Sequence, residues 1–106
     1  MAETPAAPAY LNAALRARFE ALAPSLAAMG TLTSLDTDSL ARYVISENEY
    51  LRVSQLTMEA INRGDSAEAD KWAGCQDRLL RQVMTAGAEF GLTPSSRRAR
   101  GLIPPR

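Results

Sequence analysis

A tight turn between two long helical segments is the feature that most constrains the fold of this chain. The residues 62–65, Asn-Arg-Gly-Asp, separate a segment at 34–63 that contains no glycine or proline from a second segment at 66–90. Gly64 is typical of a helix end, and Asp65 is typical of the N-cap of the next helix. Because so short a connection makes neighbouring helices antiparallel, the sequence predicts a long helical hairpin.

A further helix is predicted before the hairpin. Residues 10–29 carry apolar side chains at three- and four-residue steps, which is the period of an amphipathic helix, and Gly30 supplies a stop. Pro24 is expected to kink or break this helix near Ala23, because proline lacks an N–H and its ring clashes with the preceding turn.

The outer ends of the hairpin also carry helix signals. Thr33 with Asp36 three residues later is close to a capping box, so the second helix is expected to start at residue 34. Gly91 ends the third helix, and the Thr-Pro pair that follows predicts a short helix at 94–100. The expected fold class is all-α, with helices near residues 10–29, 34–63, 66–90 and 94–100. The expected organisation is a flexible leader at 1–9, a helical oligomerisation core at 10–92, and a basic C-terminal helix and tail at 93–106.

The second helix carries an interrupted apolar stripe. Its members at helical spacing are Leu40, Val44, Leu51, Met58 and Ile61, with Tyr43 and Tyr50 beside them. Glu47 and Ser54 interrupt the stripe, and they are expected to be exposed to solvent or paired across an interface. Apolar residues also occur on a second face, at Val53 and Leu56. A lean hairpin with more than one apolar face favours a closed cyclic homo-oligomer larger than a tetramer.

The charge of the chain is unevenly distributed. Twelve basic residues balance twelve acidic ones, but residues 31–64 and 65–92 each carry two more acids than bases. The last fourteen residues carry four arginines and no acid: Arg97, Arg98, Arg100 and Arg106. This basic end is either a solubilising tail or a docking element for phosphate or for the acidic surface of a partner.

No constellation of catalytic residues is found. The chain has no histidine and one cysteine, Cys75, which excludes an internal disulfide and a Cys/His zinc site. The carboxylate pairs Asp36/Asp38 and Glu47/Glu49 are two residues apart, so on a helix they point to different faces. Trp72 on the third helix is interpreted as core or subunit contact, with a ligand pocket as the alternative. We therefore expect no enzyme activity, no metal and no cofactor.

No signal peptide is expected at the N-terminus. The first ten residues, MAETPAAPAY, lack a basic region followed by an apolar one, and no apolar run reaches membrane-spanning length. A soluble protein without a membrane partner, located in the cytoplasm, is expected.

Three stretches of the sequence resemble the small terminase subunit of tailed double-stranded-DNA bacteriophages. FEALAPSLAAMGTLTSLD resembles the family's first helix and the start of its second, and LARY resembles the Leu-x-x-Tyr that follows. EFGLTPSSRRAR resembles the family's terminal Gly-Leu-Thr-Pro-Ser-x-Arg signature. Family members often carry a longer basic leader and a longer insertion between the two long helices, so this chain departs from the pattern at surfaces that touch DNA.

This resemblance implies a non-catalytic packaging factor in the cytoplasm of the bacterial host. Such a subunit assembles into a ring, binds double-stranded viral DNA, and delivers it to the large terminase subunit, which holds the ATPase and the nuclease. The expected DNA-contacting residues are Arg97, Arg98 and Arg100, with Arg16 and Arg18 on the first helix in reserve. The alternatives are a helical DNA-binding transcription regulator and a structural adaptor that binds no nucleic acid.

Overall fold

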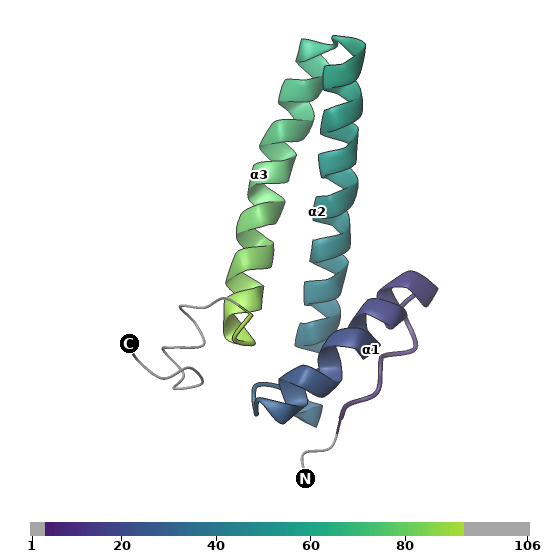
Figure 1. Ribbon diagram of the computed structural model, residues 1–106, viewed down its shortest axis with the longest axis vertical. Helices are drawn as coiled ribbons and strands as arrows, with labels where there is room; N and C mark the ends of the chain where they lie inside the picture. The colour runs from purple at the N-terminus through teal and green to yellow at the C-terminus, as the bar shows by residue number, and fades with distance from the viewer. Residues whose placement is uncertain (1–3, 93–106) are drawn as a thin grey trace.

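The computed structural model describes residues 4–92 of the chain (Figure 1). It contains three α-helices, α1 (Ala13–Ala28), α2 (Thr37–Arg63) and α3 (Ser66–Glu89), and a short 3₁₀ turn, η1 (Ser34–Asp36), that leads into α2. No strand occurs among residues 4–92, and the predicted all-α fold with a helical hairpin is confirmed. The predicted helix at 94–100 lies outside the described residues.

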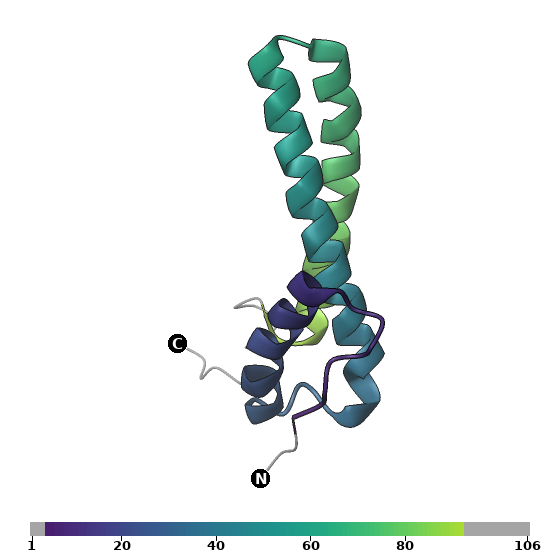
Figure 2. The ribbon, with the colours of Figure 1, turned by 90° about the vertical axis from the view of Figure 1, so that its right-hand side faces the viewer.

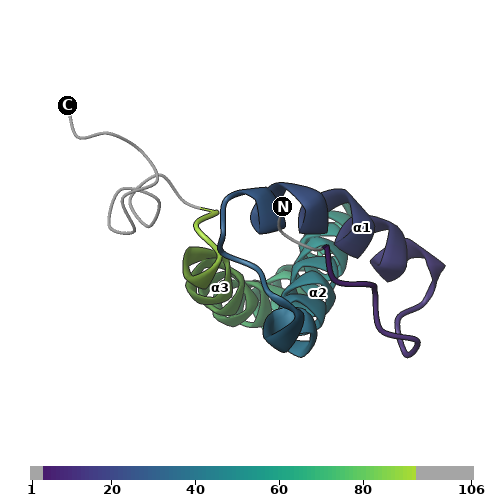
Figure 3. The same cartoon turned by 90° about the horizontal axis from the view of Figure 1, so that it is seen from below.

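The helices form a hairpin with a crosspiece at its base. The helices α2 and α3 run antiparallel and side by side over their length, while α1 lies across the end of the hairpin that is remote from the turn (Figures 1 and 2). Seen from below, α1 passes over the base of the hairpin, next to the start of α2 and the end of α3 (Figure 3). Among residues 4–92, no third helix lies beside the upper part of the hairpin.

The turn at the tip has the predicted capping. Gly64 adopts a left-handed conformation with φ of 75°, which a residue with a side chain adopts only with strain. The amide of Asp65 donates to the carbonyl of Ala60 at 2.9 Å, and the Asp65 carboxylate accepts from the amide of Glu68 at 3.1 Å. These bonds satisfy groups that the two helix ends would otherwise leave unpaired.

The capping box at the start of the second helical segment is also confirmed. The Thr33 amide donates to the Asp36 carboxylate at 3.0 Å, and the Thr33 hydroxyl accepts from the amide of Leu35 at 3.3 Å. The box opens the 3₁₀ turn, and α2 follows at Thr37.

The first helix differs from the prediction in its start and at its proline. It begins at Ala13, because the Asn12 side chain caps it by accepting from the amide of Leu15 at 2.9 Å. Of the predicted kink or break near Ala23, the break is wrong, since α1 continues through Pro24 to Ala28. Ala23 and Leu26 are both 1% exposed, so the burial of this turn offsets the backbone hydrogen bond that proline cannot donate.

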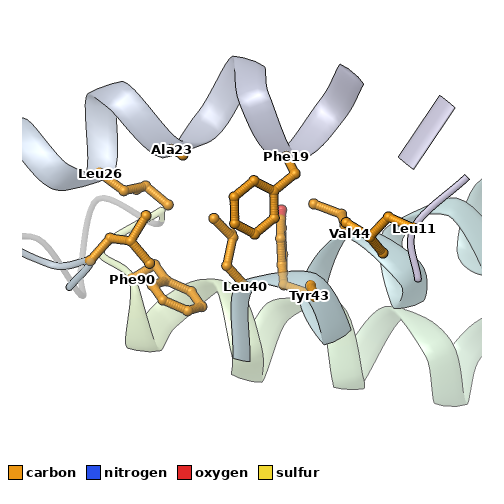
Figure 4. Close-up of a cluster of buried hydrophobic side chains, with 10 residues drawn as sticks. Leu11, Phe19, Ala23, Leu26, Leu40, Tyr43, Val44 and Phe90 are labelled. Carbon is orange, nitrogen blue, oxygen red and sulfur yellow. The ribbon is translucent and has the colours of Figure 1, made fainter. Parts of the chain in front are cut away.

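The hydrophobic core lies where α1 crosses the hairpin (Figure 4). Phe19 of α1 points into the space beside Leu40 and Tyr43 of α2, and Phe90 reaches the same cluster from the end of α3 (Figure 4). Phe19, Leu40 and Val44 are 0% exposed. Higher in the hairpin, burial is limited to smaller side chains of α2 that face α3: Val53, Thr57 and Ala60.

The predicted stripe of α2 is therefore split by α1. Leu40 and Val44 are buried, whereas Leu51, Met58 and Ile61 beyond the end of α1 are 59%, 59% and 58% exposed. The prediction that Glu47 is exposed to solvent or paired across an interface is wrong, because its side chain is 19% exposed and binds Arg18 of α1 within the same chain. Ser54 donates to the carbonyl of Tyr50 one turn earlier at 2.8 Å.

Gly74 in α3 offers a test of the exposed upper hairpin. A Cβ at this position would meet nothing within 4 Å. Since glycine in a helix interior costs about 0.5–1 kcal/mol relative to alanine, Gly74→Ala should raise the free energy of unfolding by about this amount. Chemical denaturation at fixed protein concentration measures the change. A loss of stability would show that the site is not open.

Gly87→Ala is the matched comparison within the same helix. Its Cβ would lie 3.4 Å from Cε2 of Tyr43, so crowding should reduce the gain in helix propensity. The free energy of unfolding should therefore be higher for Gly74→Ala than for Gly87→Ala.

Candidate nucleic-acid interface

The end of α3 is fastened to the base of the hairpin. After Glu89, the amide of Gly91 donates to the carbonyl of Ala88 at 3.1 Å, and the amide of Leu92 donates to the carbonyl of Gly87 at 2.9 Å. Gly91 has φ of 73°, and the pattern is that of a Schellman-type helix end. Phe90 is 3% exposed in the core, so the residue before the turn anchors it.

A close approach of α3 to α2 reinforces this anchor. Gly87 lies beside the ring of Tyr43, and its missing side chain also leaves room for Leu92. Leu92 is partly buried against the core cluster. The chain therefore leaves the described structure at Leu92 from a fixed point at the base.

The position of Leu92 limits how far the first three C-terminal arginines can reach from the base of the hairpin. An extended chain spans at most about 3.6 Å per residue, so Arg97 lies within about 18 Å of Leu92 and Arg100 within about 29 Å. The tip of the hairpin is one whole helix away, about 36 Å for the 24 residues of α3. Arg97, Arg98 and Arg100 themselves lie outside the described residues, and they follow Leu92 in the sequence by five to eight positions.

Arg18 of α1 is held by an ion pair with α2. Its Nε and Nη2 donate to the two carboxylate oxygens of Glu47 at 2.7 and 3.1 Å, a bidentate geometry that favours a strong contact. The hydroxyl of Tyr43 donates to the same carboxylate at 3.1 Å. The hydrogen bond to Glu47 raises the pKa of Arg18. The pKa of Tyr43 is also raised, mainly by burial and to a smaller extent by the negative charge of Glu47.

This cluster changes the expectation for Arg18 as a phosphate ligand. Half of its side chain is accessible, at 47%, but its charge is neutralised by Glu47. Sequence reasoning missed this partner, although Glu47 stands between Val44 and Leu51 on the apolar stripe and Arg18 precedes the buried Phe19. The sequence does place a positive charge, Arg18, and a negative charge, Glu47, next to apolar positions on two different helices. This placement was the signal that could have indicated an ion pair between them.

Arg16 lies two residues before Arg18 in α1, about half a turn nearer to the N-terminus. Its Nη2 donates to the carbonyl of Pro8 at 3.4 Å, which is a long hydrogen bond to a neutral acceptor. The N-terminal segment is also attached to α2, because the hydroxyl of Tyr10 donates to Asp38 at 2.7 Å, and this bond raises the pKa of Tyr10. Arg16 and Arg18 thus lie at the base, as the anchor of the basic segment does.

The remaining candidates lie away from the base. Trp72 is half-buried on α3, where its ring Nε1 donates to Glu68 at 2.9 Å and the Lys71 ammonium stands 5.1 Å from the ring centroid. It lines a hollow of about 320 Å³ together with Leu56 and Cys75.

In residues 4–92, no group of three or more His, Cys, Asp or Glu side chains is arranged to hold a metal ion. None of the helices described is long and apolar enough to cross a membrane.

The comparison with protein families decides the identity of this molecule. The family model described as phage terminase, small subunit, matches residues 16–102. The chain belongs to the phage terminase small-subunit family. The match takes in all but the first three residues of α1, the whole hairpin and the basic residues Arg97, Arg98 and Arg100. No curated protein and no solved structure matches the chain.

Membership makes this protein a small subunit of the phage DNA-packaging machinery, from a family that is generally non-catalytic. The resemblance stated from the sequence is confirmed for the family. For this terminase small subunit, the structure adds an anchor for the basic segment, placed at the base where α1 also lies.

Proposed function

We propose that this terminase small subunit binds double-stranded viral DNA and delivers it to the large terminase subunit, without catalysing a reaction itself. The large subunit would supply the ATPase and the nuclease. The observations that support the proposal are the family match, which covers Arg97, Arg98 and Arg100, and the fixed exit of the chain at Leu92, a few residues before them, at the base of the hairpin.

Assembly into a ring would repeat the C-terminal arginines of one subunit many times. A cyclic homo-oligomer larger than a tetramer, with the hairpins side by side, would repeat Arg97, Arg98 and Arg100 once per subunit around one rim. Each phosphate neutralised releases condensed counterions, so a rim of many weak contacts gives sequence-tolerant and strongly salt-dependent affinity. The exposed apolar residues of the hairpin support assembly, because an isolated protomer leaves them in water.

The test removes the three arginines together. Arg97→Ala, Arg98→Ala, Arg100→Ala should weaken the binding of double-stranded DNA and flatten the slope of log K against log salt concentration. Each lost phosphate contact should change the slope by about 0.9. Fluorescence anisotropy over a salt series measures both quantities, and light scattering verifies that the oligomer is intact.

A matched control removes the same charge from the hairpin. Arg52→Ala, Arg63→Ala, Arg78→Ala changes three exposed arginines that lie on the arms and the tip. This control should retain most of the slope, whereas general electrostatic attraction would weaken equally in both triple variants. If the C-terminal triple variant binds DNA like the wild type, the basic segment is not the DNA contact. Arg16 and Arg18 would then be substituted next.

A wild-type protein that binds no DNA at low salt would contradict the DNA-binding part of the proposal. It would favour a structural adaptor. A wild-type dimer bound to a short operator would favour a transcription regulator.

A further inference from the structure

A hollow lies at the junction of α1 and α2, just above the point where the two helices cross. It encloses about 430 Å³. Its apolar wall includes Leu15, Val44 and Leu51, and its polar rim includes Arg18, Glu47 and Asn48. Leu51 is 59% exposed, so the apolar stripe of α2 continues from the covered core through the hollow into solvent. A surface of this kind favours an apolar side chain from outside.

An exposed apolar knob lies on another flank of the same protomer. Met84 of α3 is 56% exposed, and Leu80 one turn earlier is 37% exposed. Val83 lines the hollow, and its neighbour Met84 is turned by about 100° around the helix axis. A protomer therefore directs Met84 away from its own hollow. Methionine is unbranched and adaptable, which suits it to filling an irregular gap.

The knob and the hollow lie at the same level along the hairpin. Gly87 of α3 lies beside Tyr43 of α2, and the hairpin turns at Gly64. Counting from this contact, Met84 is level with residue 46 of α2, within the span from Val44 to Leu51 that lines the hollow. In a ring whose axis runs along the hairpins, rotation keeps every residue at its own level. A knob can enter the hollow of the next copy only if the two are level, as they are here.

The charges around both surfaces also allow the contact. Arg18 is paired with Glu47 at the rim of the hollow, and Arg81 is paired with Asp77 beside the knob. At each surface one charged side chain is thus neutralised by a partner in its own chain, which reduces the electrostatic cost of bringing two copies together.

We propose that the subunits assemble by inserting Met84, supported by Leu80, of one copy into the α1–α2 hollow of the next. The contact is head-to-tail, so a linear assembly has a free Met84 surface at one end and a free hollow at the other. Both are filled only when the assembly closes into a ring. This inference rests on the proposed oligomer and names the surfaces that form it.

The first experiment compares exposed substitutions that leave the core intact. Met84→Lys on the knob and Leu51→Lys in the hollow should each reduce the mass in solution from that of the oligomer toward 11.5 kDa, the mass of one chain. Met58→Lys is the matched control, because Met58 is as exposed as Leu51 but lies two turns above it. The control should retain the wild-type mass. Circular dichroism should report the same helix content in all three variants.

The second experiment identifies the two surfaces directly by disulfide formation. The sole cysteine is first removed by Cys75→Ser, and Leu51→Cys and Met84→Cys are then introduced singly or together. Within one chain these positions are offset by about five residues, or about 7 Å, along helices whose axes are about 8–10 Å apart, which is too far for a disulfide. Oxidation of the double variant should therefore give a ladder of linked chains, and each single variant should stay monomeric in a denaturing gel.

The outcomes separate this inference from the proposed function. If the wild type is an oligomer and both lysine variants keep its mass, the knob-and-hollow contact is wrong while the ring stands. Linked dimers from the single Leu51→Cys variant would show that the hollow faces itself across a two-fold axis, which also overturns the inference. A monomeric wild type at tens of micromolar would overturn the proposed ring together with it.

Discussion

Phe19→Ala should lower the free energy of unfolding by about 3–5 kcal/mol, the usual cost of truncating a fully buried phenylalanine. Phe19 is 0% exposed and fills the space between α1 and α2 (Figure 4). Small domains are stable by only about 5–15 kcal/mol, so the change should remove a large part of the total. Urea denaturation at fixed protein concentration measures the loss as a shift of the midpoint.

Leu35→Ala is the control for this prediction. Leu35 is 92% exposed although it is as apolar as the core residues, so its truncation should change the free energy of unfolding by less than about 0.5 kcal/mol. Equal losses in the two variants would contradict the placement of the core at the crossing of α1 with the hairpin.

Local signals were sufficient to predict the helices. Gly64 with Asp65 and Thr33 with Asp36 each form hydrogen bonds within a few residues, so their roles depend on the nearby sequence and not on tertiary structure. For the same reason the tight turn alone established the antiparallel hairpin. The predicted ends of the hairpin helices agree with the structure to within a few residues.

Tertiary contacts explain what the sequence left open or predicted wrongly. Pro24 stays within a helix because Ala23 before it and Leu26 two residues after it are buried. Glu47 tolerates a place on an apolar stripe because Arg18 reaches it from another helix. The sequence pattern of α2 showed one stripe from Leu40 to Ile61, interrupted at Glu47 and Ser54, but it could not show that α1 covers Leu40 and Val44 and stops before Leu51. These features depend on how α1 crosses the hairpin, and no residue spacing within one helix encodes that crossing.

The sequence predicted which residues could form the candidate site, but not where they lie in the fold. The excess of arginine in the last fourteen residues is visible in the sequence, and the family match covers Arg97, Arg98 and Arg100. The structure contributes the fixed exit point at Leu92 and shows that Arg18 is engaged by Glu47. Which of these residues meet DNA stays a prediction.

Phe90→Ala tests whether the anchor at the end of α3 supports the basic segment. Phe90 is 3% exposed and packs into the core from the turn that precedes Leu92. Its truncation should cost about 3–5 kcal/mol of stability. Hydrogen exchange should show the loss first in the last turn of α3, where the amides of Gly91 and Leu92 donate back to the helix.

DNA binding should respond to Phe90→Ala differently from the arginine substitutions. All four C-terminal arginines are retained, so the slope of log K against log salt should stay near that of the wild type. The affinity should nevertheless fall, because a segment released from its anchor must be ordered again when it binds, and that ordering costs free energy. Phe90→Leu keeps an apolar anchor and should retain more of both stability and affinity. If Phe90→Ala is destabilised but binds DNA as tightly as the wild type in its intact oligomer, the fixed exit at Leu92 has no part in positioning the arginines, and their charge acts through a free tether.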